Sequence, residues 1–402
     1  MPQVPEQIAS AGTLESPALP NSAGSLFQLF RDGQPHTRAW LASMTGLARS
    51  TVSSRIEELL ASSLIAPAGE SSSTGGRPPS TFILNPGARC TVAVDLGGTH
   101  ARLAVTDLSG HILAEEDHAL AISQGPAAVL DAVADTAERL LAQAEQSPSG
   151  VLGVGIGLPG PVEFTTGRPT SPPIMPGWDG FDVPGYVRER LPVPVLVDND
   201  VNTMALGEHT MVHPEVDHMM FVKIATGIGS GIISDGHLQH GAQGAAGDLG
   251  HIAVPGGDDA PCTCGNSGCL EAVASGPAIA ARLRTSGLDV PDHAALLELV
   301  RDGEPEAVRA VRQAGRDVGS VLAGCVNLLN PSVIVIGGVV ATAGEHLLAG
   351  IRETVYSRSL PLATQHLRIV GTQTSGRAGV LGAAAMVTHH MLAAPQVNAL
   401  LS

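Results

Sequence analysis

Two glycine-rich segments, each between two apolar runs, constrain the fold of this 402-residue chain more than any other feature. The first follows a buried strand predicted at 90–94 and reads D-L-G-G-T at 95–99. The second follows 221–225 and reads T-G-I-G-S-G at 226–231. In both cases an apolar strand comes next, as in a hairpin. Two such hairpins about 130 residues apart predict a duplicated α/β fold of two lobes with a cleft between them.

Glycine hairpins of this kind are candidate phosphate-binding loops, because their backbone amides can approach a phosphate closely. The carboxylate that precedes the first glycines could hold a metal ion or a water molecule. The candidate nucleotide contacts in the two hairpins are Asp95, Gly97, Gly98, Thr99, Thr226, Gly227 and Gly229.

A cluster of soft donors lies in the second half of the chain. Three of the five cysteines occur in C-T-C-G-N-S-G-C at 262–269, and His251 precedes them by eleven residues. Three thiols and one imidazole match the donors of a closed tetrahedral zinc site. A disulfide fits poorly, since Cys262 and Cys264 are too close to pair and one thiol is left over. We predict a structural Zn²⁺ held by His251, Cys262, Cys264 and Cys269, with a redox pair plus a bystander thiol as the alternative.

Polar residues also follow the strand predicted at 193–197. Ligands bind at the carboxyl ends of strands in open sheets, so Asp200 is a candidate general base and Asn199 a partner for a neighbouring oxygen. A helix is expected to begin at Thr203, and capping of that helix by the Asn-Asp pair is the alternative role. In the sequence, Asp248 and Glu271 lie on either side of the four predicted zinc ligands. Carboxylates and amides crowded in this way suit a polyol such as a sugar.

The first 90 residues form a separate electrostatic unit. The net charge of the chain is −16, yet this segment contains six arginines and six acids, so the negative excess lies in 91–402. Of the 22 basic residues of the chain, only Lys223 is a lysine. A phosphate-binding surface would therefore be built from arginines and backbone amides.

The helical pattern of this segment is typical of a DNA-binding module. A short helix near 25–30, a second from Thr37, a turn at 45–47 and an amphipathic helix at 48–64 precede two short strands joined by a polar loop. This order predicts a winged helix-turn-helix, whose second helix enters the major groove, and a three-helix packing module with a Ser-rich hairpin is the alternative. The candidate DNA contacts are Arg49, Ser50, Thr51, Ser53, Ser54, Arg55 and Arg77.

Composition narrows the class of protein further. A hydrophobic fraction of 44% favours a globular protein over a disordered one. No apolar run reaches the length of about 18 residues typical of a membrane span, and residues 1–12 lack a signal pattern. We therefore expect a cytoplasmic protein. In the cytoplasm thiols stay reduced, so they are available to bind a metal ion.

Several motifs together resemble the ROK family (repressors, open reading frames and sugar kinases). They are D-L-G-G-T at 95–99, G-L-P-G-P-V at 157–162, D-N-D-V-N at 198–202, T-G-I-G-S-G at 226–231, G-D-L-G-H at 247–251, C-T-C-G-N-S-G-C-L-E at 262–271 and N-P-S-V-I-V-I-G-G at 330–338. The resemblance covers most of the chain. The predicted wing with G-G-R-P at 75–78 is similar to the regulator branch of the family.

The resemblance implies a two-lobed actin-like or hexokinase-like (ribonuclease H-like) ATPase fold behind a winged helix-turn-helix. It implies a sugar held by Asn199, Asp200, His251 and Glu271, with one ring nitrogen of His251 on zinc and the other on the sugar. Gly337 and Gly338 would lie on the adenosine side. We expect a disordered tail at 1–20, the winged domain at 21–88, an N-terminal lobe at 89–200 completed by a helix at 376–395, and a C-terminal lobe at 201–375.

Two positions depart from the family pattern. Asp248 replaces the usual glutamate, which shortens the side chain by one methylene, and Val339 stands where kinases have a third glycine, so we expect it to crowd a nucleotide. Three functions follow as hypotheses. The first is a sugar-responsive repressor of carbohydrate genes, a homodimer or homotetramer that binds operator DNA in the bacterial nucleoid. The second is a sugar kinase that uses ATP and Mg²⁺ with Asp200 as the catalytic base. The third is a regulator with a vestigial pocket.

Overall fold

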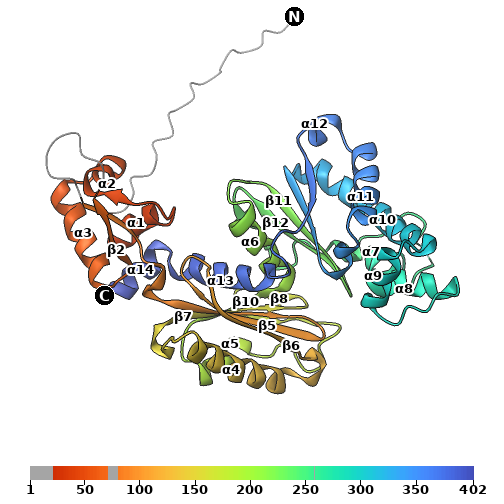
Figure 1. Ribbon diagram of the computed structural model, residues 1–402, viewed down its shortest axis with the longest axis horizontal. Coiled ribbons are helices and arrows are strands. Elements are labelled where there is room, and N and C mark those ends of the chain that lie inside the picture. The colour runs from red at the N-terminus through yellow and green to blue at the C-terminus, as the bar shows by residue number, and fades with distance from the viewer. Residues whose placement is uncertain (1–20, 71–79, 258) are drawn as a thin grey trace, which may run out of the picture. The chain divides into compact units, whose positions relative to one another are not determined.

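The computed structural model describes residues 21–70, 80–257 and 259–402, which form two compact units (Figure 1). The N-terminal unit runs to Ala88 and also includes Met391–Ser402, while the larger unit is Arg89–His390. The predicted tail at 1–20, and the part of the predicted wing that contains Arg77, lie outside the described residues. In the part of the chain that the structure describes, no helix is long and apolar enough to cross a membrane.

The N-terminal unit is a winged helix-turn-helix with a C-terminal helix added. Its elements are α1 (Ala23–Phe27), β1 (His36–Thr37), α2 (Arg38–Thr45), α3 (Arg49–Ala61), β2 (Ile65–Glu70), β3 (Ser80–Leu84) and α14 (Ala394–Leu401), with 3-10 turns at Gln28–Phe30 and Pro86–Ala88. The Thr37 hydroxyl caps α2 by accepting from Trp40 N, and Gly46 ends it in the left-handed conformation. That turn brings α3 back across α2, and Leu41, Val52 and Ile56 are buried between them. The three strands pair in the order β1-β3-β2.

The N-terminal lobe of the larger unit is a five-stranded sheet. Its strands and helices are β4 (Cys90–Leu96), β5 (His100–Asp107), β6 (Ile112–Ala119), α4 (Pro126–Gln143), β7 (Val151–Leu158), α5 (Val183–Arg190) and β10 (Val195–Asn199), with a small ribbon of β8 (Val162–Glu163) and β9 (Arg168–Pro169) and 3-10 turns at Ile122–Gln124 and Pro148–Gly150. The strand order is β10-β7-β4-β5-β6. Trp178, which is fully buried, packs in the core on the α4 side and donates its ring N–H to Ile122 O.

The C-terminal lobe repeats this topology. Its elements are α6 (Asp200–Val212), β11 (Met219–Ile224), β12 (Ile228–Ser234), β13 (His237–Leu238), α7 (Leu270–Ala274), α8 (Gly276–Thr285), α9 (His293–Arg301), α10 (Pro305–Leu329), β14 (Val333–Gly337), α11 (Glu345–Arg358), α12 (Pro361–Thr364) and β15 (Arg368–Gly371), with 3-10 turns at Leu249–His251 and Val339–Ala343. The strand order is β13-β12-β11-β14-β15.

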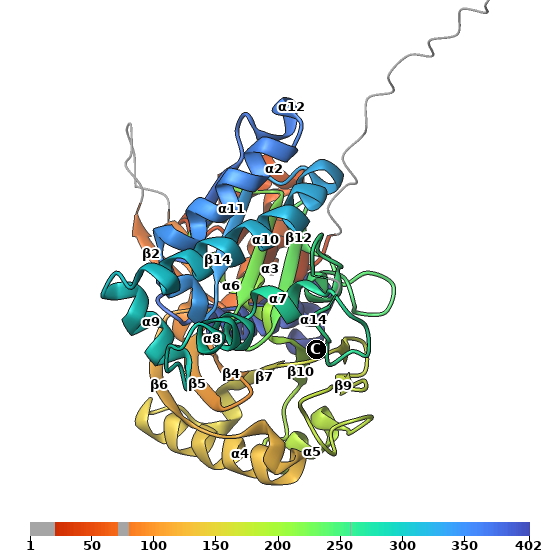
Figure 2. The same ribbon diagram turned by 90° about the vertical axis from the view of Figure 1, so that its right-hand side faces the viewer.

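The two sheets are built by the same rule. In each, the first strand pairs antiparallel with the next along the chain and parallel with the fourth strand of the lobe, as β4 does with β5 and β7 and as β11 does with β12 and β14. The glycine segments at 97–99 and 225–227 are the turns of the two antiparallel hairpins. Figure 2 shows β4, β5 and β7 in one sheet and β12 and β14 in the other. The predicted duplicated two-lobed fold is therefore confirmed.

Helix α13 (Ala378–Met391) lies on the face of the N-terminal sheet opposite α4 (Figure 1). It crosses α6 at close range, since a Cβ added at Gly382 would lie 1.6 Å from Thr203 O and one added at Gly207 would lie 2.1 Å from Ala378 O. The helix predicted over 376–395 is in fact two helices, because the chain leaves α13 after Met391 and restarts as α14 with a proline in its first turn.

Candidate functional site

The metal-binding donors predicted from the sequence come together in the structure. One ligand atom from each of His251, Cys262, Cys264 and Cys269 lies within 4.8 Å of all the others. The Sγ atoms of Cys264 and Cys269 are 3.7 Å apart, and Cys262 Sγ lies 3.5 Å from Nδ1 of His251. Thiolates bound at about 2.3 Å to one tetrahedral ion lie about 3.8 Å apart. The four side chains therefore fit a single tetrahedral metal ion.

The local backbone prepares one of these thiols for binding a metal. The backbone N–H of Asn266 lowers the pKa of the Cys264 thiol to about 7, with smaller contributions from the neighbouring thiols and His251. The thiolate is the form that binds metals. In contrast, burial raises the pKa of Cys269, so metal binding at this cluster must release a proton.

The start of α6 presents two of the predicted sugar ligands. Asn199 caps the helix, because its Oδ1 accepts from Val201 N at 2.9 Å, while its Nδ2 donates to Gly160 O. The expected start of this helix at Thr203 was wrong: the cap places the first helical residue at Asp200. Asp200 is buried and accepts a hydrogen bond of 2.5 Å from Nζ of Lys223, the residue that precedes Ile224 at the end of β11.

Strand β12 links this helix start to the metal cluster. Gly229 lies against Val201 of α6, and Gly250 approaches Ile228 O closely. Glu271, two residues after Cys269, accepts from Ile228 N through its carboxylate at 3.1 Å. Because Nδ1 of His251 faces the thiols, the other ring nitrogen is left for a ligand. Asp248 is exposed in the turn before His251.

The predicted nucleotide contacts have structural roles of their own. A Cβ at Gly97 would lie 2.2 Å from the His100 ring, one at Gly227 would lie 2.5 Å from the Glu271 carboxylate, and one at Gly337 would lie 2.3 Å from the Phe221 ring. Gly338 has a φ of 85° and packs against Ile224. A side chain at Gly97, Gly227 or Gly337 would therefore have to displace His100, Glu271 or Phe221, whether or not a nucleotide binds. Gly98, beside which only Ile174 lies at 3.7 Å, carries no such constraint.

Asp95 is the titratable group of the first glycine hairpin. Its side chain is buried, and a Cβ added at Gly379, near the start of α13, would lie 2.2 Å from its carboxylate. Burial raises the pKa of the Asp95 carboxyl to about 6, and the charge of Lys223 opposes this rise. Thr99 and Thr226 are exposed at the tips of the two hairpins.

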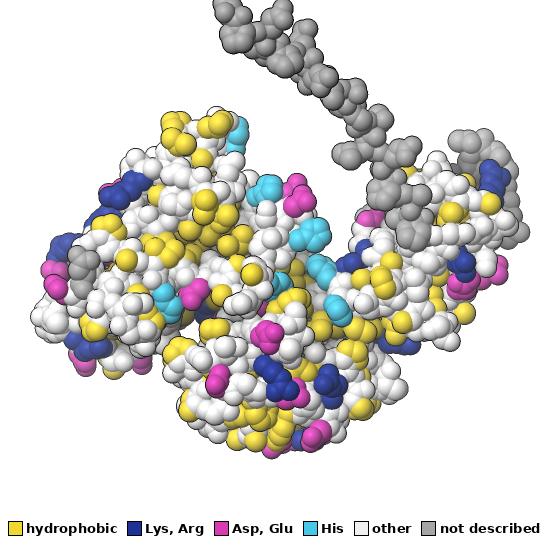
Figure 3. Space-filling view, turned by 180° about the vertical axis from the view of Figure 1, so that it is seen from behind, with side chains coloured by type: hydrophobic (Ala, Val, Ile, Leu, Met, Phe, Trp, Pro, Cys, Tyr) yellow, Lys and Arg dark blue, Asp and Glu magenta, His cyan; other side chains and the backbone are white. Residues whose placement is uncertain are grey.

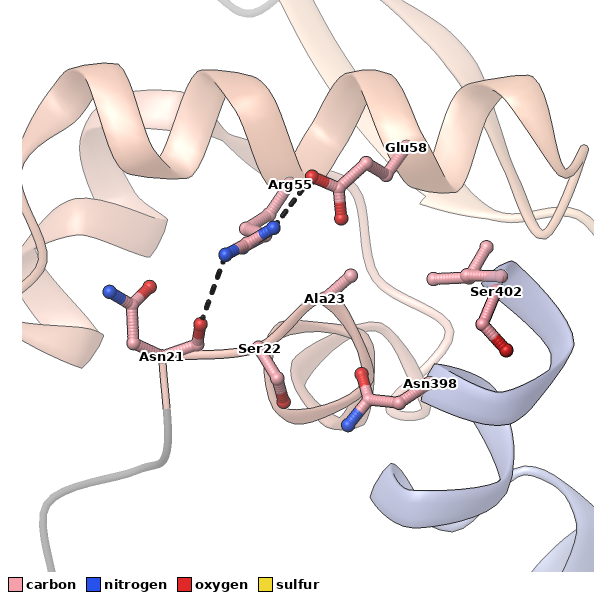
Figure 4. Close-up of a pocket in the computed structure, with 8 residues that line it drawn as sticks. Asn21, Ser22, Ala23, Arg55, Glu58, Asn398 and Ser402 are labelled. Atoms are coloured by element: carbon pink, nitrogen blue, oxygen red, sulfur yellow. Dashed lines mark hydrogen bonds and ion pairs between the residues drawn. The ribbon is translucent and has the colours of Figure 1, made fainter.

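The predicted DNA contacts of α3 divide into two sets. Arg49, Ser50 and Ser54 are exposed, whereas Thr51, Ser53 and Arg55 are half-buried. Arg55 turns toward a cavity of about 220 Å³ in the N-terminal unit, where it donates to Glu58 at 2.6 Å and to Asn21 O (Figure 4). Asn398 of α14 and Ser402, the residue after that helix, line the same cavity.

Comparison with known proteins identifies the family. A family model described as ROK family matches residues 91–390, which is most of the chain. The chain belongs to the ROK family.

ROK relatives differ in how much of this chain they match. A putative xylose repressor of Caldicellulosiruptor sp. (strain Rt8B.4) is 30% identical and spans 90% of this chain and 94% of its own length. A glucokinase of Halalkalibacterium halodurans is 33% identical and spans 73% of this chain and 93% of its own. A crystal structure of a ROK family transcriptional regulator, a homologue of the E. coli MLC protein, covers 94% of this chain and 98% of that chain, with a TM-score of 0.81 and 26% identity. The regulator-type matches thus extend into the N-terminal unit.

Two polar contacts of this ROK site were missed by the sequence reasoning. Asp198 accepts from Asn202 Nδ2 at 2.8 Å and lies 2.6 Å from Nε2 of His240, whose ring stacks on Phe164. The sequence identified Lys223 only as the single lysine of the chain and predicted no contact for it. The D-N-D string could have indicated Asp198. In contrast, nothing in the sequence pairs His240 with a residue 42 positions earlier.

Proposed function

We propose that this protein is a sugar-responsive transcriptional repressor of carbohydrate metabolism in a bacterial cytoplasm. The observation that carries the proposal is the presence, in one chain, of a winged helix-turn-helix and a two-lobed unit with carboxylate, amide and imidazole groups around β12. The repressor relatives match both parts, which supports the same combination of roles here.

In this proposal the sugar binds against Asn199, Asp200, Glu271 and the free ring nitrogen of His251. Each sugar hydroxyl can donate one hydrogen bond and accept others, so carboxylates and amides are suitable partners. His251 and the three cysteines hold a structural Zn²⁺, which fixes the orientation of the His251 ring. Because all four coordination positions are filled by protein ligands, no position is open for catalysis. Asp248 has one methylene fewer than the family's usual glutamate, so we expect a water molecule to bridge it to the sugar.

The operator is bound by α3 in the major groove, with Arg49, Ser50 and Ser54 on its exposed face. We expect sugar and operator to oppose each other. The coupling free energy between them is reciprocal, so DNA must weaken sugar binding by the same factor by which sugar weakens DNA binding.

Two subunits are needed to bind a two-fold-symmetric operator, and we propose a homodimer or homotetramer. Leu328 and Leu362 are 82% and 80% exposed, and both lie near the junction of α10 and α12, where Leu360 N donates to Asn327 Oδ1. Apolar side chains gather over this part of the lobe in Figure 3. Sedimentation of the full chain tests the proposal, and a monomer at micromolar concentration would contradict it.

The decisive experiment is a titration of DNA binding by sugars at fixed salt, since salt alone changes the affinity. Operator sequences are first selected from random duplexes, and the release of the full chain is then followed by fluorescence anisotropy with D-xylose, D-glucose and N-acetyl-D-glucosamine. One sugar should release the DNA from the wild type and fail to release it from Asp200→Asn. DNA affinity unchanged by any of these sugars would refute the proposal.

A second candidate function is an ATP-dependent sugar kinase, possible because Asp95, Asp200 and the glycine hairpins are retained. In this role Asp200 would accept the hydroxyl proton, and Mg²⁺ would bind with the phosphates. A coupled ADP-release assay across hexoses distinguishes the two functions. Turnover that Asp200→Asn abolishes would replace the purely regulatory proposal.

A further inference from the structure

Lys223, the single lysine of the chain, lies inside the larger unit and not on its surface. Met219 and Phe221, on the same face of β11, pack against Val201 and Ala205 of α6. The two-residue period of a strand directs Lys223 to that face as well, one residue before β11 ends. The side chain therefore reaches the first residue of α6, which is Asp200.

The contact between the two side chains is short and enclosed. Nζ of Lys223 lies 2.5 Å from Oδ2 of Asp200, and the exposed fractions of the two side chains are 17% and 4%. The residues paired with Lys223 on the neighbouring strands are Gly229 and Gly337, which have no side chain. Among the described residues, one of the three ammonium hydrogens bonds to Asp200, and the other two are available to another partner.

The positive charge of Lys223 lies near two carboxyl groups, those of Asp200 and Asp95. Burial alone would lower the pKa of Lys223, but the charge and hydrogen bond of Asp200 and the charge of Asp95 outweigh it, so the pKa lies above its ordinary value. Lys223 accordingly carries a positive charge near neutral pH. A hydrogen bond between an ammonium and a carboxylate is charge-assisted, so it is shorter and stronger than one between neutral groups.

We infer that Lys223 and Asp200 form one donor–acceptor unit that binds a single hydroxyl of the sugar and determines the specificity of the pocket. Lys223 donates to the hydroxyl oxygen, and the hydroxyl donates to Asp200. The ammonium supplies the positive charge at this position, so sugar binding needs neither Mg²⁺ nor a nucleotide. This inference rests on the proposed sugar-binding function.

The test is isothermal titration of the full chain with D-xylose, D-glucose and N-acetyl-D-glucosamine, without Mg²⁺ or nucleotide, followed by the monodeoxy analogues of the tightest binder. K223M and D200N should each weaken binding at least tenfold. The sugar affinity of the double variant should be at most about threefold below that of the single variant with the lower affinity. The reason is that either substitution alone already breaks the donor–acceptor unit. One deoxy analogue should bind the wild type weakly and bind the double variant as well as the parent sugar does.

Either single variant leaves one charge buried without its partner, so it could fail to fold. The double variant removes both charges and carries the test alone in that case, with its melting temperature and metal content as checks of folding. The inference is overturned if the wild type binds a sugar and the double variant binds it equally well, if the losses in the single variants multiply, or if the wild type binds sugar only with Mg²⁺ and a nucleotide. A wild type that binds none of the three sugars would instead contradict the proposed function itself.

Discussion

The backbone N–H of Gly24 donates a hydrogen bond of 2.8 Å to Oδ1 of Asn398, 374 positions further along the chain. The Gln28 side chain adds a second bond, to Leu392 O, and a Cβ at Gly24 would lie 2.1 Å from Ala394 O. Helix α14 is thus part of the winged unit.

Changes on either side of this contact should loosen the N-terminal unit. We expect Asn398→Ala to reduce its stability by about 1 kcal/mol through the lost hydrogen bond, and Gly24→Ala to reduce it by about 2 kcal/mol because the new methyl group overlaps the backbone of α14. Hydrogen exchange should accelerate in α1 and α3. Asn327→Ala, which removes an amide from the larger unit, is the control, and α1 and α3 should exchange in it as in the wild type. Unchanged exchange in Gly24→Ala would contradict the packing described here.

Loss of one thiol should release the proposed zinc ion and weaken sugar binding together. Cys264→Ser removes one of four donors, and we expect the metal content to fall below one ion per chain and sugar affinity to fall at least tenfold, because the His251 ring loses its anchor. Metal analysis and calorimetry on the same samples measure both. Cys325→Ser, a half-buried thiol of α10 outside the cluster, should change neither. Full sugar affinity in a metal-free Cys264→Ser protein would refute the link.

Asp95 makes stability depend on pH in a direction opposite to that of most carboxylates. Its pKa is raised by burial from 3.8 to about 6, so the folded protein holds a proton that the unfolded chain has already lost. Stability therefore falls as the pH rises from about 4 to about 6, and the loss is complete above that range. Asp95→Asn should raise the free energy of unfolding by about 3 kcal/mol at pH 8 and by less at pH 5.

Urea unfolding at the two pH values measures this effect. Asp235→Asn, in an exposed turn, is the control and should show no comparable gain at pH 8. A gain for Asp95→Asn that is equal at pH 5 and pH 8 would mean that the charge of Asp95 is not its cause.

The two arginines of α3 should behave differently toward DNA. Arg49 is exposed at the start of the helix, so Arg49→Ala should weaken binding and lower the salt slope by about one ion. Arg55 is held by Glu58, so Arg55→Ala should mainly reduce stability. Anisotropy titrations at several salt concentrations compare the two variants. An equal loss of slope in both would restore Arg55 as a phosphate contact, as the sequence predicted.

The metal cluster and the two-lobed fold were accessible from sequence because each is written in short, local patterns. Three cysteines within eight residues must stay near one another in any fold, and a strand, glycine turn and strand form a hairpin largely by local geometry. The start of α6 was predicted three residues late because Asn199 acts as the cap of the helix as well as a candidate ligand, and the side-chain hydrogen bond decides between the two possible starts.

Sequence alone determined the family, the order of the lobes, the candidate metal donors and the winged helix-turn-helix, since these depend on residue type and spacing. Only the tertiary structure decided that Lys223 meets Asp200, that His240 meets Asp198, and that Arg55 turns away from the exposed face of α3. Partners of the first two kinds are separated by up to 42 residues, and the side chain of Arg55 could lie on more than one face of its helix. The packing of elements distant in sequence determines which contacts form. Burying a charged side chain is unfavourable unless the fold places an oppositely charged partner beside it. The sequence does not show which residue that partner is.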